Sequence, residues 1–242
     1  MASIIDFHHH IKGGDLYRRE ATAEQVVAMA DRAGIEKTVV FSMSLPSRES
    51  NELTQREAAK FPERLLPFAH VLPQEGALAL REVDRCFEEL GWRGLKLHRG
   101  EAMDLSPSAF VPLLKKCAEA QRPCLIDVAS QLDFARELAE AVPDCPLVIA
   151  HLGAPHNEAL VDQFLNLALE YPHLRFDLSY CHVPWKMQGA VDTLGAERLL
   201  FGSDGPLIHP LIELAKIEVL DLDEEQRRLI LHDNAAALLG LE

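Results

Sequence analysis

The sequence has no apolar run that approaches the roughly 18 to 20 residues needed to span a bilayer. Its opening residues, MASIIDFHHH, also lack the basic segment and the small-residue cleavage site of a secretory signal peptide. We therefore expect a soluble protein of the cytoplasm that has no membrane partner.

Basic residues are scarce relative to acidic ones. The chain has 24 Lys and Arg against 38 Asp and Glu, which gives a formal net charge of −14 at pH 7. Binding to nucleic acid relies on clustered cations that release counterions from the phosphates. The charge balance therefore argues against DNA or RNA as a partner.

Cysteine is infrequent as well. The five cysteines are odd in number, widely spaced and without a Cys-x-x-Cys pair. This pattern argues against a disulfide framework or a zinc or redox motif. We expect reduced thiols, most of them packed as small core residues.

What the sequence does contain is a repeated alternation of short aliphatic runs with longer segments of helical period, about eight times over. The expected strands are residues 3–8, 37–42, 65–71, 94–98, 123–128, 146–151, 174–179 and 198–203. Strand, helix and strand repeated in this way require parallel pairing. With 242 residues, of which 48% are hydrophobic, residues 1–242 fit one compact (β/α)8 TIM-barrel domain. An open doubly wound sheet is the alternative.

The clearest expected helices follow these strands, at residues 23–33, 75–90, 107–120, 132–141, 158–170 and 210–219. Residues 223–241 add a further helical pattern after the eighth unit. We expect this tail to cover one end of the barrel or to pack on its outside.

The first expected strand ends in three consecutive histidines. Because side chains alternate along a strand, His8 and His10 share one face with Asp6. Phe7 and His9 share the other face, which we expect to pack against helices. His8 and His10 would then point into the barrel mouth and could hold one cation. A purification-tag remnant is the alternative, but the histidines lie within a strand pattern and not in a Gly/Ser-rich leader.

The fourth expected strand places Lys96 and His98 on one face. Such a lysine could be a carbamylated ligand between two metals, a cation for a substrate carboxylate, or an ion-pair partner of Asp6 or Asp127. His98, at the strand end, could ligate metal, bind substrate or move a proton. We assign both residues to substrate binding, together with Tyr180 after the seventh strand.

The sixth and eighth expected strands end in polar residues at the rim where a parallel barrel forms its active site. His151 ends an apolar run, where burying an imidazole without a polar partner would be costly. Asp204 precedes Gly-Pro, a setting more typical of a turn. Its place among strand-end histidines nevertheless favours a functional role.

These residue types suit the activation of water by a metal. A divalent cation held by neutral imidazoles and a carboxylate lowers the pKa of its water from about 15.7 to about 7. Asp204 could bind the cation and accept the proton of that water. His151 could stabilise the oxyanion or protonate the leaving group.

Four segments carry a likeness to a known family: residues 6–10 (DFHHH), 94–98 (GLKLH), 150–153 (AHLG) and 201–204 (FGSD). In this order they resemble the amidohydrolase superfamily, in particular the amidohydrolase-related branch that includes aminocarboxymuconate-semialdehyde decarboxylase-like enzymes. Residues 232–241 are similar to the closing helix of that branch. The resemblance implies one divalent metal, expected to be Zn with Mn or Fe as alternatives. It also implies metal ligands His8 and His10, a sixth-strand histidine at His151, and Asp204 as ligand and base.

The chain departs from the family pattern at the end of the fifth strand. The family usually has a metal-binding histidine there, whereas this sequence has Asp127. An aspartate can replace histidine and make the site harder and more anionic, but it can also accompany altered chemistry or loss of the metal. We expect Asp127 to be a further metal ligand.

The expected activity is metal-dependent hydrolysis of an amide, lactone or ester in a small molecule. Non-oxidative decarboxylation on the same scaffold is the nearest alternative, and a metal-free barrel that only binds a ligand is the non-enzyme alternative. A TatD-like phosphodiesterase shares the His-x-His start, but the acidic composition and the lack of Arg-rich loops oppose it. Such barrels are often homo-oligomers. Among the remaining histidines, His70 is expected to be structural.

Overall fold

The computed structural model describes residues 3–13 and 20–241. Within these residues, nine short strands pair in parallel in two ladders, β1-β2-β3 and β4-β5-β6-β7-β8-β9. The strands are β1 (Ile5–Lys12), β2 (Lys37–Ser42), β3 (Leu65–Pro67), β4 (Ala69–His70), β5 (Leu95–His98), β6 (Cys124–Asp127), β7 (Leu147–Ile149), β8 (Arg175–Asp177) and β9 (Leu199–Leu200). Every strand overlaps a segment that the sequence predicts as one.

β3 and β4 are two parts of the third expected strand. The backbone N–H of Phe68 donates to the carbonyl of Val40 in β2, and that of Ala69 donates to the carbonyl of Gly94 before β5, each at 2.9 Å. The chain therefore changes its pairing partner at Phe68 and joins the two ladders. Gly94 permits this close approach, because a Cβ there would lie 2.3 Å from the Phe68 ring.

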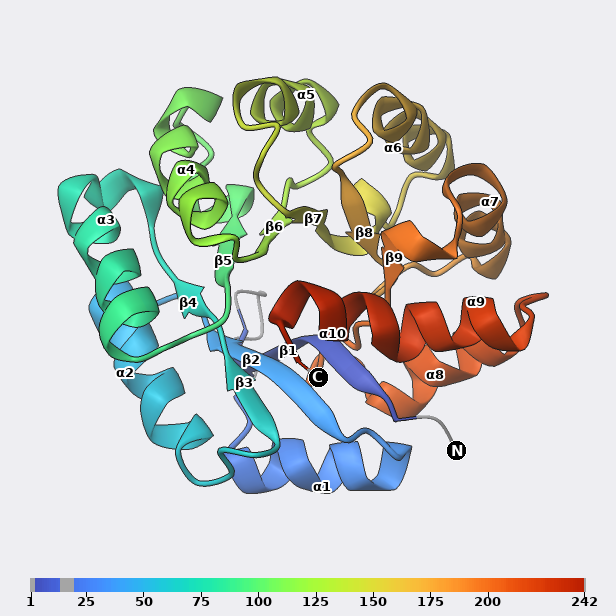
Figure 1. Ribbon diagram of the computed structural model, residues 1–242, viewed down its shortest axis with the longest axis horizontal. Helices are drawn as coiled ribbons and strands as arrows, with labels where there is room; N and C mark the ends of the chain where they lie inside the picture. The colour runs from blue at the N-terminus through green and yellow to red at the C-terminus, as the bar shows by residue number, and fades with distance from the viewer. Residues whose placement is uncertain (1–2, 14–19, 242) are drawn as a thin grey trace.

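The remaining gap, between β1 and the segment that follows β9, is closed by backbone hydrogen bonds. The N–H of Phe7 donates to the carbonyl of Phe201 at 2.9 Å, and the N–H of Asp204 donates to the carbonyl of His8 at 2.8 Å. His9 and Gly205 add a parallel bridge. The strands thus form a closed (β/α)8 barrel with its helices outside (Figure 1), which confirms the expected fold.

The outer helices are α1 (Ala23–Ala33), α2 (Ser47–Ala58), α3 (Ala77–Asp84), α4 (Val111–Ala120), α5 (Leu132–Ala141), α6 (Glu158–Glu170), α7 (Pro184–Leu194) and α8 (Pro210–Glu218). α1 has the bounds expected from the sequence, since a capping box of Thr22 and Gln25 starts it and Gly34, at φ 70°, ends it. In the described part of the chain no helix is long and apolar enough to cross a membrane. All five cysteines are buried free thiols.

α2 is absent from the clearest expected helices because its inner face is largely polar. The buried residues of this face include Ser47, Ser50, Asn51, Thr54 and Glu57. Ser50 donates to the carbonyl of Ser42 at 2.5 Å, and the amide of Asn51 donates to the carbonyl of His70 at 3.0 Å. α2 therefore attaches to the barrel largely through hydrogen bonds and shows no apolar stripe in its sequence.

The C-terminal segment covers one end of the barrel. It comprises α9 (Glu224–Arg228), a π-helical segment (Leu229–Asp233) and α10 (Asn234–Leu239). Ala235 and Leu239 pack in one apolar cluster with the barrel residues Ile5 and Leu200. The side chain of Asn234 donates to the carbonyl of Leu199, at the start of β9, at 2.7 Å. α10 thus covers the N-terminal end of the strands, which leaves the opposite end for a functional site.

The expectation that the face of β1 with Phe7 packs against the outer helices is wrong. Ile5 and Phe7 pack in the barrel interior and not against the outer helices. His8 and His10 face the interior as well, because the pairing with β2 shifts register between Asp6 and His9. A β-bulge of this kind inserts one residue and reverses the alternation of faces beyond it. Strict alternation of faces, as expected from the sequence, therefore does not hold along the strand.

Candidate metal centre

A pocket of about 450 Å³ lies at the C-terminal ends of the strands. It is lined by all eight residues assigned to the site from the sequence, namely His8, His10, Lys96, His98, Asp127, His151, Tyr180 and Asp204. These residues come from six different strand ends, which the closed barrel brings to one rim. Their individual roles stay predictions.

The backbone around the pocket is strained. In the loops after β6, β7, β8 and β9, six non-glycine residues have φ between 49° and 60°: Ala129, Ser130, His151, Leu152, Tyr180 and Asp204. All of them except Leu152 line the pocket. Left-handed backbone costs of order 1–3 kcal/mol per residue and clusters at functional sites. This concentration of strain marks the pocket as the functional end of the barrel.

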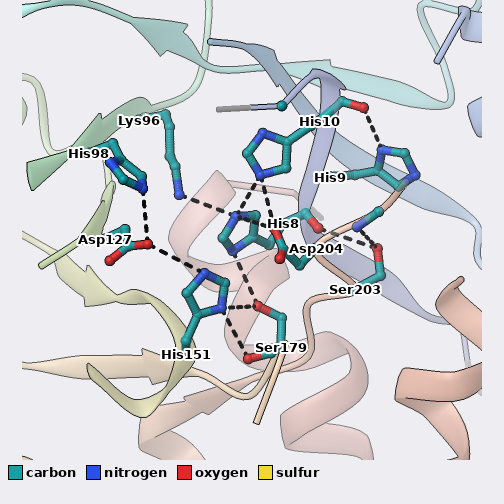
Figure 2. Close-up of polar contacts among 12 residues, drawn as sticks. His8, His9, His10, Lys96, His98, Asp127, His151, Ser179, Ser203 and Asp204 are labelled. Atoms are coloured by element: carbon teal, nitrogen blue, oxygen red, sulfur yellow. Dashed lines mark hydrogen bonds and ion pairs between the residues drawn. The ribbon is translucent and has the colours of Figure 1, made fainter. Parts of the chain in front are cut away.

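Three donor atoms converge in the pocket (Figure 2). His8 Nε2 lies 3.3 Å from His10 Nε2, and Asp204 Oδ1 lies 3.0 Å from His10 Nε2 and 3.4 Å from His8 Nε2. All three residues are buried. Two imidazole nitrogens and one carboxylate oxygen are the ligand types that Zn and neighbouring first-row metals bind. His9 points away from this cluster, as expected, with Nδ1 3.1 Å from the carbonyl oxygen of His10.

The charge state of the cluster also suits a cation. Burial, followed by the charge of Lys96, lowers the pKa of His8 to about 3 and lowers the pKa of His10 well below its ordinary value. Both imidazoles are therefore neutral at neutral pH and offer a lone pair, as metal binding requires. The residues present thus fit a divalent metal.

Buried carboxylates behind the cluster hold it in place. Asp177 Oδ2 lies 2.7 Å from His8 Nδ1. Asp6 accepts hydrogen bonds from the backbone N–H of His8 at 3.1 Å and from the N–H of Ser203 at 2.8 Å. Burial raises the pKa of Asp6 to about 7, although these hydrogen bonds lower it. Asp6 therefore fixes the distance between β1 and the segment that carries Asp204.

His151 and Asp127 form a neighbouring group with His98 (Figure 2). Asp127 Oδ2 lies 3.2 Å from His98 Nε2 and 3.7 Å from His151 Nε2. Burial would raise the pKa of Asp127, but His98 and His151 hold it well below its ordinary value. His151 stacks on His8 with ring centroids 4.9 Å apart. Asp127 thus contacts two imidazoles, and its role as a further metal ligand stays a prediction.

Lys96 is buried in the pocket wall. Its Nζ lies 3.2 Å from His8 Nε2 and 5.0 Å from the centroid of the Phe41 ring. Burial lowers its pKa, against the charges of Asp127 and other carboxylates. Within residues 3–13 and 20–241, no carboxylate oxygen lies within 4 Å of this ammonium. The ion pair of Lys96 with Asp6 or Asp127, one of the three alternatives, is therefore not formed.

Aromatic rings cluster beside the pocket, and two of them, those of His156 and Tyr180, line it. The ring centroid of Tyr180 lies 5.7 Å from that of His151, 5.0 Å from that of His156 and 4.9 Å from that of His182.

His70 lies outside the pocket wall, with Nε2 2.8 Å from Glu101 Oε2. The expectation that His70 is a satisfied structural histidine is confirmed.

The sequence-based reasoning missed the residues that support the cluster. From the sequence, Asp177 belongs only to a small polar group with Tyr180 at the end of the seventh expected strand, where it could select substrate, and Ser179 and Ser203 have no assigned role. The available signal was the alternation of Asp177 and Ser179 at the end of a strand, which places both side chains on one face. Their partners, His8 on β1 and His151 just after β7, belong to distant parts of the chain and could not be predicted from it.

Comparisons with known proteins agree with the fold. A family model described as amidohydrolase matches residues 5–241. The 5-carboxyvanillate decarboxylase from Sphingomonas paucimobilis superposes with a TM-score of 0.79 at 14% identity, covering 100% of both chains. The 2,6-dihydroxybenzoate decarboxylase from Rhizobium gives 0.76 at 19% identity, covering 99% of both chains.

A dihydroxybenzoic acid decarboxylase from Polaromonas sp. JS666, solved with bound manganese, gives a TM-score of 0.76 at 18% identity over 99% of this chain and 97% of that one. At such low identity these likenesses show the fold, whereas the family model covers nearly all of the chain. The family model and the structural neighbours agree with the family resemblance of the four sequence motifs. The chain therefore belongs to the amidohydrolase superfamily.

Proposed function

We propose that the chain is a metal-dependent hydrolase that cleaves an amide, lactone or other ester bond of a small molecule. The observation that carries the proposal is the convergence of His8 Nε2, His10 Nε2 and Asp204 Oδ1 within 3.0–3.4 Å of one another in an open pocket. When bound there, a divalent cation supplies Lewis acidity, which makes water a better nucleophile and a carbonyl a better electrophile. We propose Zn, with Mn or Fe as alternatives.

Asp204 is proposed as the general base. Its carboxylate lies at the pocket wall, 3.0 Å from His10 Nε2. An ionised carboxylate only accepts protons and hydrogen bonds, so it can take a proton from an attacking water and return it to the leaving group. The left-handed backbone at Asp204, with φ 54°, aims the side chain into the pocket.

His151 is proposed as the electrophilic group or acid. Burial alone would lower its pKa, but the negative charges of Asp204, Asp177 and Asp127 raise it above its ordinary value. The imidazole therefore holds a proton more readily than a free histidine does. A positively charged imidazole in the pocket wall can stabilise a developing oxyanion or protonate the leaving group.

Lys96, His98 and Tyr180 are proposed to bind the substrate. The ammonium of Lys96 has no carboxylate within 4 Å in the described part of the chain, so a carboxylate of the substrate can pair with it. His98 is partly exposed in the pocket and Tyr180 lines its wall. These features favour a small anionic substrate.

Non-oxidative decarboxylation is the second candidate. The proton that His151 holds in the pocket could be delivered to a carbon atom as CO2 departs. The three structural neighbours described above are named as decarboxylases, of 2,6-dihydroxybenzoate, 5-carboxyvanillate and dihydroxybenzoic acid. Lys96 would then bind the carboxylate that is lost or a neighbouring one.

Metal content provides the first test. The full chain, loaded with Zn²⁺ and desalted, should retain about one equivalent of zinc by elemental analysis. The variants His8→Ala and Asp204→Ala should each lose the zinc, because each removes one of the three converging donors. Asp162→Ala, which makes the same change at a surface residue of α6, should retain the metal. Wild-type protein that binds no metal under these conditions would refute the proposal.

The products separate the two candidate activities. The loaded enzyme would be assayed against lactones, aryl esters, N-acyl amino acids and hydroxybenzoates, with acid release followed by pH-stat and CO2 release by a coupled assay. Acid release without CO2, abolished in Asp204→Asn, supports hydrolysis. CO2 release from a benzoate would instead establish the decarboxylase.

A further inference from the structure

Asp177 is fully buried at the end of β8, behind the pocket wall, and its carboxylate contacts both His8 and His151. We propose that Asp177 is a positioning residue that keeps a proton on Nδ1 of both imidazoles, directly at His8 and through Ser179 at His151, so that Nε2 of each faces the pocket. The inference rests on the metal site proposed for His8. One buried carboxylate would then orient both a proposed metal ligand, His8, and the proposed acid, His151.

The tautomer of His8 follows from the contacts of its two ring nitrogens. The hydroxyl oxygen of Ser179 lies 3.3 Å from Nδ1, and because this hydroxyl donates its own proton to Asp177, its oxygen can only accept from His8. Asp177 Oδ2, 2.7 Å from His8 Nδ1, can only accept, so Nδ1 carries the proton. On the opposite side of the ring, Nε2 faces the ammonium of Lys96 at 3.2 Å, and an ammonium can only donate. These contacts leave the lone pair on Nε2, the atom that faces His10 and Asp204.

At His151, Asp177 acts through Ser179, whose hydroxyl it orients. His151 Nδ1 lies 3.1 Å from the carbonyl oxygen of Ser179, which only accepts, and 2.9 Å from its hydroxyl oxygen. The hydroxyl of Ser179 donates its own proton to Asp177 Oδ1, so its oxygen is left to accept from His151. Nδ1 of His151 therefore carries a proton, and Nε2 faces Asp127 at 3.7 Å.

Asp177 also holds the backbone that carries these groups. Its Oδ1 accepts hydrogen bonds from the N–H of Ser179 at 2.8 Å and the N–H of His151 at 3.3 Å, in addition to the Ser179 hydroxyl. His151 has a left-handed φ of 60°. Three donors therefore converge on one carboxylate oxygen, while the other oxygen faces His8 alone.

This asymmetry decides what the isosteric variant Asp177→Asn would do. The amide oxygen must take the Oδ1 position, because three donors point at it. The amide NH2 then faces His8 Nδ1 and donates to it, which moves the imidazole proton to Nε2. A proton on Nε2 blocks the lone pair that the metal needs. We expect zinc affinity to fall by about 10- to 100-fold, as is typical when the residue that orients a metal-binding histidine is removed.

Two measurements on the full chain test this. Long-range ¹H–¹⁵N spectra of histidine-labelled, metal-free protein report which nitrogen of His8 carries the proton, with the His8 signal assigned from His8→Gln. Competition with a chromogenic chelator gives the Kd for Zn²⁺. We expect Nδ1–H in wild type, and Nε2–H with weaker zinc binding in Asp177→Asn. Ser179→Ala should keep a near wild-type Kd, because it removes only the 3.3 Å contact of Ser179 with His8 Nδ1 and keeps the 2.7 Å contact of Asp177 with that atom.

The outcomes separate this inference from the proposed function. A wild-type His8 that carries its proton on Nε2 overturns the inference even if Asp177→Asn fails to fold. A folded Asp177→Asn with unchanged zinc Kd and unchanged tautomer overturns it as well, while the metal-dependent function would stand. Wild-type protein that binds no zinc would refute the proposed function, yet the tautomer of His8 would still test the role of Asp177.

Discussion

Replacing Gly202 by alanine should push His8, one of the proposed metal ligands, out of its position. A Cβ at Gly202 would lie 2.8 Å from His8 Cβ, 3.3 Å from Ser179 Cβ and 3.5 Å from Asp177 Cγ. Ordinary van der Waals contact begins at about 3.4 Å, so His8 Cβ or the strand behind it would have to move by roughly 0.6 Å. All these neighbours are buried, which leaves little free space to absorb the shift.

The size of the effect follows from this displacement. Overpacking a well-packed core typically costs about 1–3 kcal/mol. In a domain of this size each kcal/mol lowers Tm by about 2–4 °C. Metal sites keep their ligand distances within about 0.2 Å, so a shift of roughly 0.6 Å at His8 should also weaken zinc binding. We expect an increase in the zinc Kd of about 10- to 100-fold, similar to that for loss of an orienting contact.

The assay compares melting curves and zinc Kd values of Gly202→Ala, wild type and Gly189→Ala. Gly189 lies in α7, where a Cβ would meet no neighbouring atom of the described residues within 4 Å, so the same chemical change is accommodated without a clash. Gly189→Ala should keep the zinc Kd and gain roughly 0.5–1 kcal/mol of stability, because alanine loses less entropy in a helix. If Gly202→Ala matches wild type in both Tm and Kd, the reasoning about the packing behind His8 is refuted.

Two further predictions concern the rim and the pocket. Burial would raise the pKa of Glu101, but the hydrogen bond from His70 lowers this pKa to about 2. The ionised Glu101 therefore stabilises the fold above pH 4.5, and this stabilisation is lost as the pH falls toward 2. Glu101→Gln should therefore be less stable than wild type in urea at pH 7, by a margin that shrinks toward pH 3; a margin independent of pH would contradict this. Lys96→Met should bind benzoate more weakly than wild type by calorimetry on zinc-loaded protein, with zinc content unchanged, and equal benzoate affinity would refute Lys96 as the anion-binding cation.

The sequence by itself determined the order of the strands and the positions at which they end. A strand covered on both faces needs apolar residues throughout, so segments such as residues 146–150 are recognisable locally. His151 and Asp204 are conspicuous for the same reason, because each lies where such an apolar segment ends at the barrel rim. All eight candidate residues line one pocket, since the rim of a parallel barrel is defined by strand direction alone.

The helix α2 shows where local patterns fail. Its buried face is polar and is satisfied by hydrogen bonds to barrel groups such as the carbonyls of Ser42 and His70. A periodicity argument detects apolar stripes only, and polar burial depends on partners that are distant in the sequence.

Only the tertiary structure decided which rim residues bring their donor atoms together around one possible metal position. A bulge in β1, which exists only through pairing with β2, sets the face that His8 and His10 occupy. Asp127 and Asp204 both follow strands, yet Asp204 lies between the two histidines while Asp127 contacts His98 and His151. The physical reason is that strand position fixes the end of the barrel at which a side chain lies, whereas the distances between side chains depend on the stagger and curvature of the closed sheet, which arise only when all the strands pair.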